Sequence, residues 1–80
     1  MEFPHFYRDM YLQILEIVKE SGKVNEPQIR EKMPEIGDHG FLYLYNLELR
    51  GCLTREFSDG QSHFKITPRG EDYLEGILIS

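Results

Sequence analysis

The pattern of apolar residues changes at Gly51, and this change limits the possible folds more than any other feature of the sequence. Before Gly51 the apolar residues recur at helical spacing, and after it short β-prone runs take over. The chain has 80 residues, which suffice for one domain and are too few for two. The sequence therefore predicts a single α+β domain over residues 1–80, in which helices precede a β-hairpin.

Three helices are expected in the first part of the chain. Residues 6–21 carry an apolar stripe at helical spacing, which consists of Tyr7, Tyr11, Ile14, Leu15 and Val18. A second helix is expected over about 26–33, with Asn25 as its N-cap, and a third over about 39–50, with Asp38 as its N-cap. Two helices separated by a turn of about four residues form a helix-turn-helix unit.

A β-hairpin and a last helix are expected after Gly51. The pair Asp59-Gly60 lies between two β-prone runs and is a strong signal for a two-residue hairpin turn. Thr67 then serves as an N-cap and Pro68 as the first residue of a C-terminal helix. The predicted order is helix, short extended step, two helices, two strands and a helix.

Two motifs connect these elements to a known family. They are Leu44-x-x-Leu47-x-x-x-Gly51-Cys52-Leu53 and Phe64-Lys65-Ile66-Thr67-Pro68-x-Gly70-x-x-Tyr73-Leu74. Through these two motifs, residues 10–76 resemble the winged helix-turn-helix superfamily of prokaryotic transcription regulators. Within this superfamily the chain is most similar to small archaeal phage-repressor-like regulators, and more loosely similar to MarR-like domains. The resemblance implies a winged helix-turn-helix fold with a three-helix core, a two-stranded wing and a C-terminal helix. It also implies a small transcription regulator that binds double-stranded DNA without a cofactor.

The candidate DNA-binding residues follow from this resemblance and from the register of the third helix. If Leu44 and Leu47 face the core, the opposite face of that helix is turned outward. In a major groove, Asn46 is able to make a bidentate contact to adenine, and basic side chains nearby are able to contact phosphates. The candidate residues, called the DNA set below, are His39, Leu42, Tyr43 and Asn46 in the third helix, Arg30 in the second, and Arg55 and Lys65 in the hairpin.

The charge of the chain favours an alternative function. Its net charge is −5, whereas a domain that binds DNA mainly through phosphates usually carries a basic excess. DNA-binding members of the family usually place polar or basic residues early in the third helix, but no Arg or Lys occurs here between Gly37 and Leu49. The alternative is a protein-interaction winged-helix module that does not bind DNA, with the Leu- and Tyr-rich face as its contact. In a third interpretation the tyrosines pack on neighbouring helices, and Asn46 and the hairpin are merely solvated.

Other classes of function have little support in the sequence. The spacing of Cys52 and the three histidines matches no metal-binding motif, and no catalytic arrangement is recognisable. We therefore expect no enzyme activity and no metal or cofactor, and we expect Cys52 to be a buried small hydrophobic residue. A single cysteine and the lack of a long apolar run fit a cytoplasmic protein that does not enter a membrane.

Apolar residues near both ends of the chain exceed what one small core requires. Paired across a two-fold axis, they would form a homodimer that holds two recognition helices about one DNA turn apart, roughly 34 Å. A monomer whose ends fold back on the core is the alternative. The expected dimer contacts are Phe3, Phe6, Ile77, Leu78 and Ile79.

Overall fold

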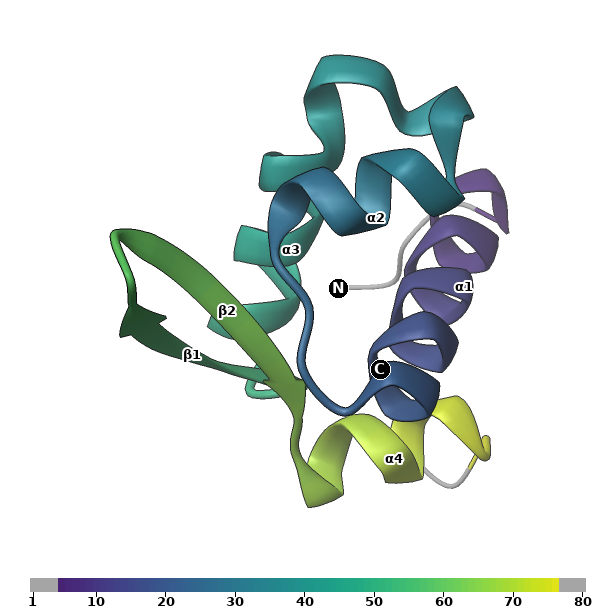
Figure 1. Cartoon of the computed structure of the whole chain (residues 1–80). Coiled ribbons are helices and arrows are strands. Elements are labelled where there is room, and N and C mark those ends of the chain that lie inside the picture. The colour runs from purple at the N-terminus through teal and green to yellow at the C-terminus, as the bar shows by residue number, and fades with distance from the viewer. Residues whose placement is uncertain (1–4, 77–80) are drawn as a thin grey trace.

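The structure is a computed structural model, and it describes residues 5–76, with side chains from residue 9 onward. Four α-helices, one 3₁₀ helix and a two-stranded antiparallel sheet make up this part of the chain (Figure 1). The elements are α1 (His5–Ser21), α2 (Glu26–Lys32), η1 (Pro34–His39), α3 (Gly40–Leu49), β1 (Leu53–Ser58), β2 (Gln61–Ile66) and α4 (Pro68–Leu74). The chain is thus a small α+β domain with a hairpin that is compatible with a wing. None of the helices in residues 5–76 has the length and apolar character to cross a membrane.

The start of α2 is fixed by a reciprocal cap. The Asn25 side chain accepts a hydrogen bond from the backbone N–H of Gln28 at 3.0 Å, and the Gln28 side chain accepts from the backbone N–H of Asn25 at 2.8 Å. Each bond satisfies a donor that the first helical turn leaves without a partner. The prediction that Asn25 caps this helix is therefore confirmed.

The connection between α2 and α3 differs from the prediction. Residues Pro34–His39 are 3₁₀ segments on either side of a kink at Gly37, where φ is 60° and ψ is −134°, and the second segment runs directly into α3 without an N-cap at Asp38. His39 occupies the N-cap position with helical angles of φ −91° and ψ 0°, and it makes no side-chain cap hydrogen bond. An Asp cap needs an extended backbone at the cap residue. Asp38 lies inside the 3₁₀ helix, so its side chain cannot serve as the cap.

The hairpin forms as its sequence predicts. Strands β1 and β2 pair in register from Leu53 opposite Ile66 to Ser58 opposite Gln61. Asp59 and Gly60 have φ values of 54° and 76°, and a two-residue type I′ turn requires positive φ at both positions. In Figure 1 the hairpin extends to the left, away from α1 on the right.

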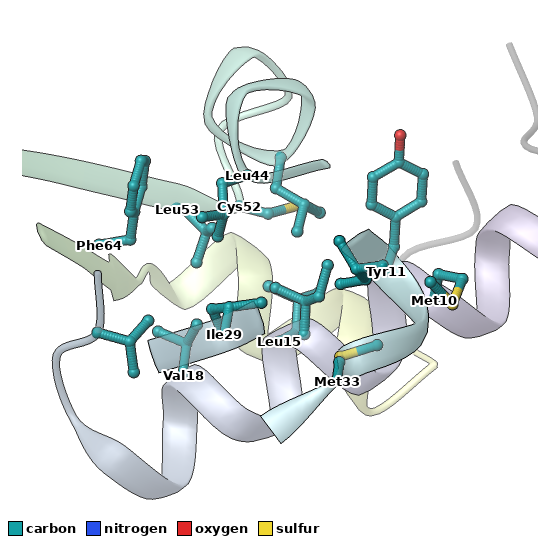
Figure 2. Close-up of a cluster of buried hydrophobic side chains, with 14 of the residues drawn as sticks. Met10, Tyr11, Leu15, Val18, Ile29, Met33, Leu44, Cys52, Leu53 and Phe64 are labelled. Atoms are coloured by element: carbon teal, nitrogen blue, oxygen red, sulfur yellow. The ribbon is translucent and has the colours of Figure 1, made fainter. Parts of the chain in front are cut away.

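The core lies where α1, α2, α3 and the hairpin converge (Figure 2). Side chains from all four meet there, and the most deeply buried are Ile14, Leu15, Val18, Val24, Ile29, Met33, Leu44, Leu47 and Phe64. The predicted stripe of α1 is confirmed from Tyr11 to Val18, while the side chain of Tyr7 is not among those described. Leu44 and Leu47 are 0% and 1% exposed, so the predicted register of α3 is also confirmed. This register determines which face of α3 points outward.

The last helix closes the domain against the end of α3. The Thr67 hydroxyl accepts a hydrogen bond from the backbone N–H of Gly70 at 3.0 Å and donates to the carbonyl of Gly51 at 2.6 Å. Arg69 donates from Nε to the carbonyl of Arg50 at 2.9 Å, instead of pairing with an acidic neighbour on its own helix. The residues after α3 and the start of α4 are therefore tied together.

Candidate functional site

The outward face of α3 is apolar. Because Leu44 and Leu47 point into the core, the residues on the opposite side of the helix remain at the surface. We call this surface the α3 face, and it consists of Phe41, Leu42, Tyr45 and Leu49, with exposed fractions of 48%, 56%, 41% and 67%. The rings of Phe41 and Tyr45 are stacked, with centroids 6.3 Å apart and planes 6° apart. The two aromatic rings thus form one flat surface on the helix.

A fifth exposed apolar side chain belongs to the neighbouring strand. Side chains alternate along a strand, so Leu53, Arg55 and Phe57 lie on the same face of β1. Leu53 is buried, and Arg55 bonds to Glu48 of α3, so this is the face of the hairpin that is turned toward the helix. Phe57 lies two residues after Arg55 on the same face of the strand and is 74% exposed. Among the described side chains, all the large hydrophobic residues that remain exposed therefore lie on α3 or β1.

The α3 residues of the DNA set have different environments. His39, Leu42 and Asn46 are exposed, as predicted. Tyr43 is only half-exposed, because its ring packs edge-on against Tyr11 of α1 at a centroid distance of 5.3 Å. Asn46 is also tied to α1, since its amide donates to the Tyr11 hydroxyl at 3.0 Å. The expectation that Tyr43 points outward is therefore wrong in large part.

The sequence reasoning did not identify Phe41 and Tyr45 as surface residues. In the structure Gly40 is buried on the same side of the helix as Leu44 and Leu47, and Phe41 is exposed. A Cβ on Gly40 would lie 3.0 Å from Glu26 Oε2 and 3.1 Å from Ile36 Cγ2, so little room exists for a side chain. The spacing of Phe41, Tyr45 and Leu49 at i, i+4 and i+8 was the signal that could have shown a second stripe on this helix.

Each basic residue of the DNA set has a carboxylate partner. Arg30 donates from Nε to Glu26 Oε2 at 3.0 Å, and this hydrogen bond and the charge of Glu26 raise the pKa of the guanidinium. Arg55 makes a two-pronged contact with Glu48 at 3.2 and 2.7 Å, and its guanidinium carbon lies 5.8 Å from the centre of the Phe64 ring. A carboxylate therefore lies beside each of these two guanidinium groups.

Lys65, the third basic residue of the set, belongs to a charge cluster on the hairpin. Its ammonium lies 3.0 Å from Glu56, and Lys23 approaches the same carboxylate at 3.8 Å. The hydrogen bond from Lys65, followed by the charges nearby, lowers the pKa of Glu56. Glu56 therefore stays ionised and offsets part of the positive charge of the hairpin.

The polar chemistry of the described residues offers little beyond these pairs. No group of three or more His, Cys, Asp or Glu side chains within the described part is arranged to hold a metal ion. Cys52 is buried, as predicted, and desolvation raises the pKa of its thiol. Because a thiolate is the reactive form, this thiol is unreactive at neutral pH.

The predicted dimer contacts fall outside the described side chains. Phe3, Ile77, Leu78 and Ile79 lie beyond residues 5–76, and Phe6 is described only as backbone. The resemblance to winged helix-turn-helix regulators therefore rests on the two motifs, and the structure adds an α+β architecture that is compatible with it. Comparisons of the chain with family models, curated proteins and solved structures found no match.

Proposed function

We propose that this chain is a winged helix-turn-helix domain that binds a protein, and not DNA, through the α3 face. The element order supports the fold, with α2 and α3 in the positions of the two helix-turn-helix helices and β1–β2 in the position of the wing. The observation that carries the function is the composition of the outward face of α3. It presents aromatic and aliphatic side chains where a DNA-reading helix presents hydrogen-bonding groups.

The side chains on this face are poorly suited to DNA. Phe41, Leu42 and Leu49 have no polar atom for a base edge, and the amide of Asn46 already bonds to Tyr11. The basic residues of the DNA set are in surface ion pairs, which are weak, so a phosphate could displace the carboxylates. The displaced Glu26, Glu48 and Glu56 would then remain beside the phosphates. Their repulsion would offset the attraction of the freed cations.

The same side chains are well suited to a protein partner. A fully exposed aromatic side chain has about 200 Å² of surface, so the α3 face and Phe57 together expose on the order of 500 Å². That is the size of the largest apolar patch on a typical monomer, and such patches are often functional. Aromatic residues without neighbouring charge are also the usual anchors at the centre of protein interfaces.

DNA binding is the second candidate function. The exposed His39 and Asn46 at α3, together with the resemblance to transcription regulators, favour it. Titration of the full chain with random duplex DNA at low salt separates the two functions. We expect no saturable binding up to about 100 µM protein, which is the weak limit of ordinary non-specific binding at physiological salt.

Saturable binding at low micromolar concentration would contradict the proposal. Two variants would then assign it: Arg55→Ala removes a residue of the DNA set, and Lys19→Ala removes an α1 cation outside the set. Loss of binding in Arg55→Ala alone would support a regulator that uses the hairpin and α3. Equal loss in both variants would indicate unspecific attraction between charges.

A further inference from the structure

We infer that the protein bound by the α3 face is a second copy of this chain, in an antiparallel pair of α3 helices related by a two-fold axis near Tyr45. The inference rests on the proposed function, because it names the partner of the same surface. It also differs from the dimer predicted through the chain ends, which leaves α3 free for DNA.

The row of residues on α3 is self-complementary. Phe41, Tyr45 and Leu49 follow one another at intervals of four residues, so they form a ridge along the helix. In a two-fold contact, residue i of one copy meets residue j of the other, and j meets i. With the axis near the central Tyr45, Phe41 of each copy faces Leu49 of the other, and the two Tyr45 rings lie side by side. Each end of the ridge thus pairs an aromatic with an aliphatic side chain.

The lack of charge on the face favours a second copy over a different partner. Only groups close to a two-fold axis lie near their own copy, so a charged residue at the centre of the contact would meet a like charge. The single charged residue of α3 is Glu48, and Arg55 of the same chain holds it at 2.7 Å. Pairing through this face therefore brings no unpaired like charges together. A basic partner protein would be attracted by acidic groups, but the residues of the α3 face carry none of the chain's excess negative charge.

The area is sufficient for a weak dimer. The α3 face together with Phe57 exposes on the order of 500 Å² in each copy, so a contact that covers Phe57 as well buries on the order of 1,000 Å², the lower limit for a specific interface. The aromatic rings of Phe41 and Tyr45 are stacked within each copy before contact, so little ordering is required on association. We expect a Kd on the order of 50 µM for this small contact.

Sedimentation of the full chain from about 5 to about 500 µM tests the inference, because this range brackets the expected Kd. We expect wild-type protein to convert from monomer to dimer across it. Leu49→Glu, at a position 67% exposed, is expected to fold normally and to weaken association at least about tenfold, because it places a carboxylate against Phe41 of the other copy at each end of the contact. The matched control is Gln13→Glu, which adds the same charge on an exposed position of α1 and should associate like the wild type. A monomeric wild type at the highest concentration, or equal behaviour of the two variants, would overturn the inference.

A cross-linking measurement locates the axis independently. Facing residues near a two-fold axis bring their Cα atoms within the ~4.4–6.8 Å that a disulfide spans. Tyr45→Cys should therefore form a disulfide-linked dimer on mild oxidation much faster than Gln13→Cys, while the buried Cys52 stays reduced in both. Equal rates for the two variants would overturn the proposed axis.

Two further results separate this inference from the other claims. Deletion of residues 77–80 is expected to leave association unchanged, and a dimer that depends on those residues would overturn pairing through α3. A monomeric chain that also fails to bind duplex DNA would overturn the second copy as partner but leave protein binding by the α3 face intact. Tight DNA binding would overturn the proposed function itself.

Discussion

Gly70 determines how closely the last helix approaches the end of α3. A Cβ at this position would lie 2.2 Å from the carbonyl oxygen of Cys52 and 2.8 Å from Ile66 Cγ1. The nearer contact is to backbone, which cannot rotate away as a flexible side chain could. This glycine belongs to the second of the two sequence motifs, and the structure gives a steric reason for it. The φ angle of Gly70 is not positive, so backbone freedom is not the cause.

Gly70→Ala is therefore expected to lower the free energy of unfolding by about 3 kcal/mol, the upper part of the range for overpacking. Urea denaturation of Gly70→Ala and Gly22→Ala measures this. Gly22 is the matched control, because its Cβ would meet nothing within 4 Å but its φ is 83°. That change should cost only about 1–2 kcal/mol, from strain in the left-handed conformation. A smaller loss for Gly70→Ala than for Gly22→Ala would show that α4 docks less closely.

The buried Cys52 gives a prediction with a definite sign in pH. Burial raises the pKa of its thiol in the folded chain, so the folded state holds the proton more tightly than the unfolded state. This contribution to stability is complete below the unfolded pKa and is lost as pH rises through the folded pKa. Urea denaturation from neutral to alkaline pH should therefore show a loss of stability in the wild type that is smaller in Cys52→Ala. An identical loss of stability at alkaline pH in both proteins would contradict a raised pKa of the Cys52 thiol in the folded state.

At the scale of elements, α3 separates its two faces sharply. Leu47 is 1% exposed between the helix and the hairpin, and Leu49, two residues later, is 67% exposed. The first position therefore contributes to the core and the second to the α3 face. The same substitution at both positions tests this division.

Leu47→Ala is expected to destabilise the domain by about 2–5 kcal/mol, because it leaves a cavity in the core. That is a large part of the total stability, about 4–12 kcal/mol for a chain of this length. Leu49→Ala should change stability by less than about 0.5 kcal/mol at concentrations where the chain is monomeric. Denaturant unfolding followed by circular dichroism measures both, and similar losses in the two variants would show that the register of α3 is wrong.

The elements that the sequence predicted correctly are those governed by local chemistry. The cap at Asn25 and the turn at Asp59-Gly60 depend on residues at most three positions apart, and the stripe of α1 depends on helical spacing. The environment of Tyr43 stayed open between an outward position and packing on a neighbouring helix, because it depends on Tyr11, which is distant in the sequence and meets Tyr43 only after α1 and α3 pack. The start of α3 was predicted to within one residue, but its cap was not, because Asp38 is a good cap in isolation, whereas the chain enters α3 there from a 3₁₀ segment.

At the scale of the whole molecule, the net charge of −5 and the apolar α3 face have opposite effects on association. Two copies repel each other through their excess acidic groups, while the neutral faces attract. Salt screens the repulsion, with a Debye length of about 10 Å at 0.1 M, but does not weaken apolar burial.

Self-association is therefore expected to strengthen a few-fold between about 0.05 and about 0.5 M salt, as the Debye length falls below 5 Å. DNA binding would respond in the opposite way, because each phosphate contact lowers log K with log salt by a slope of about −0.9. Sedimentation of the wild type at several salt concentrations measures the direction. Association that weakens as salt rises would show that the contact depends on ion pairs and not on the α3 face.

The most direct test of the central claim uses two series of amide ¹H–¹⁵N NMR spectra of the full chain. One series follows dilution of the protein, and the other follows addition of random duplex DNA at low salt. If the α3 face binds a second copy of the chain and α3 does not bind DNA, the signals of Phe41, Leu42, Tyr45 and Leu49 shift on dilution, and DNA leaves the spectrum unchanged. The opposite result would contradict the claim: no change on dilution, together with DNA-induced shifts at Arg30, Asn46, Arg55 and Lys65.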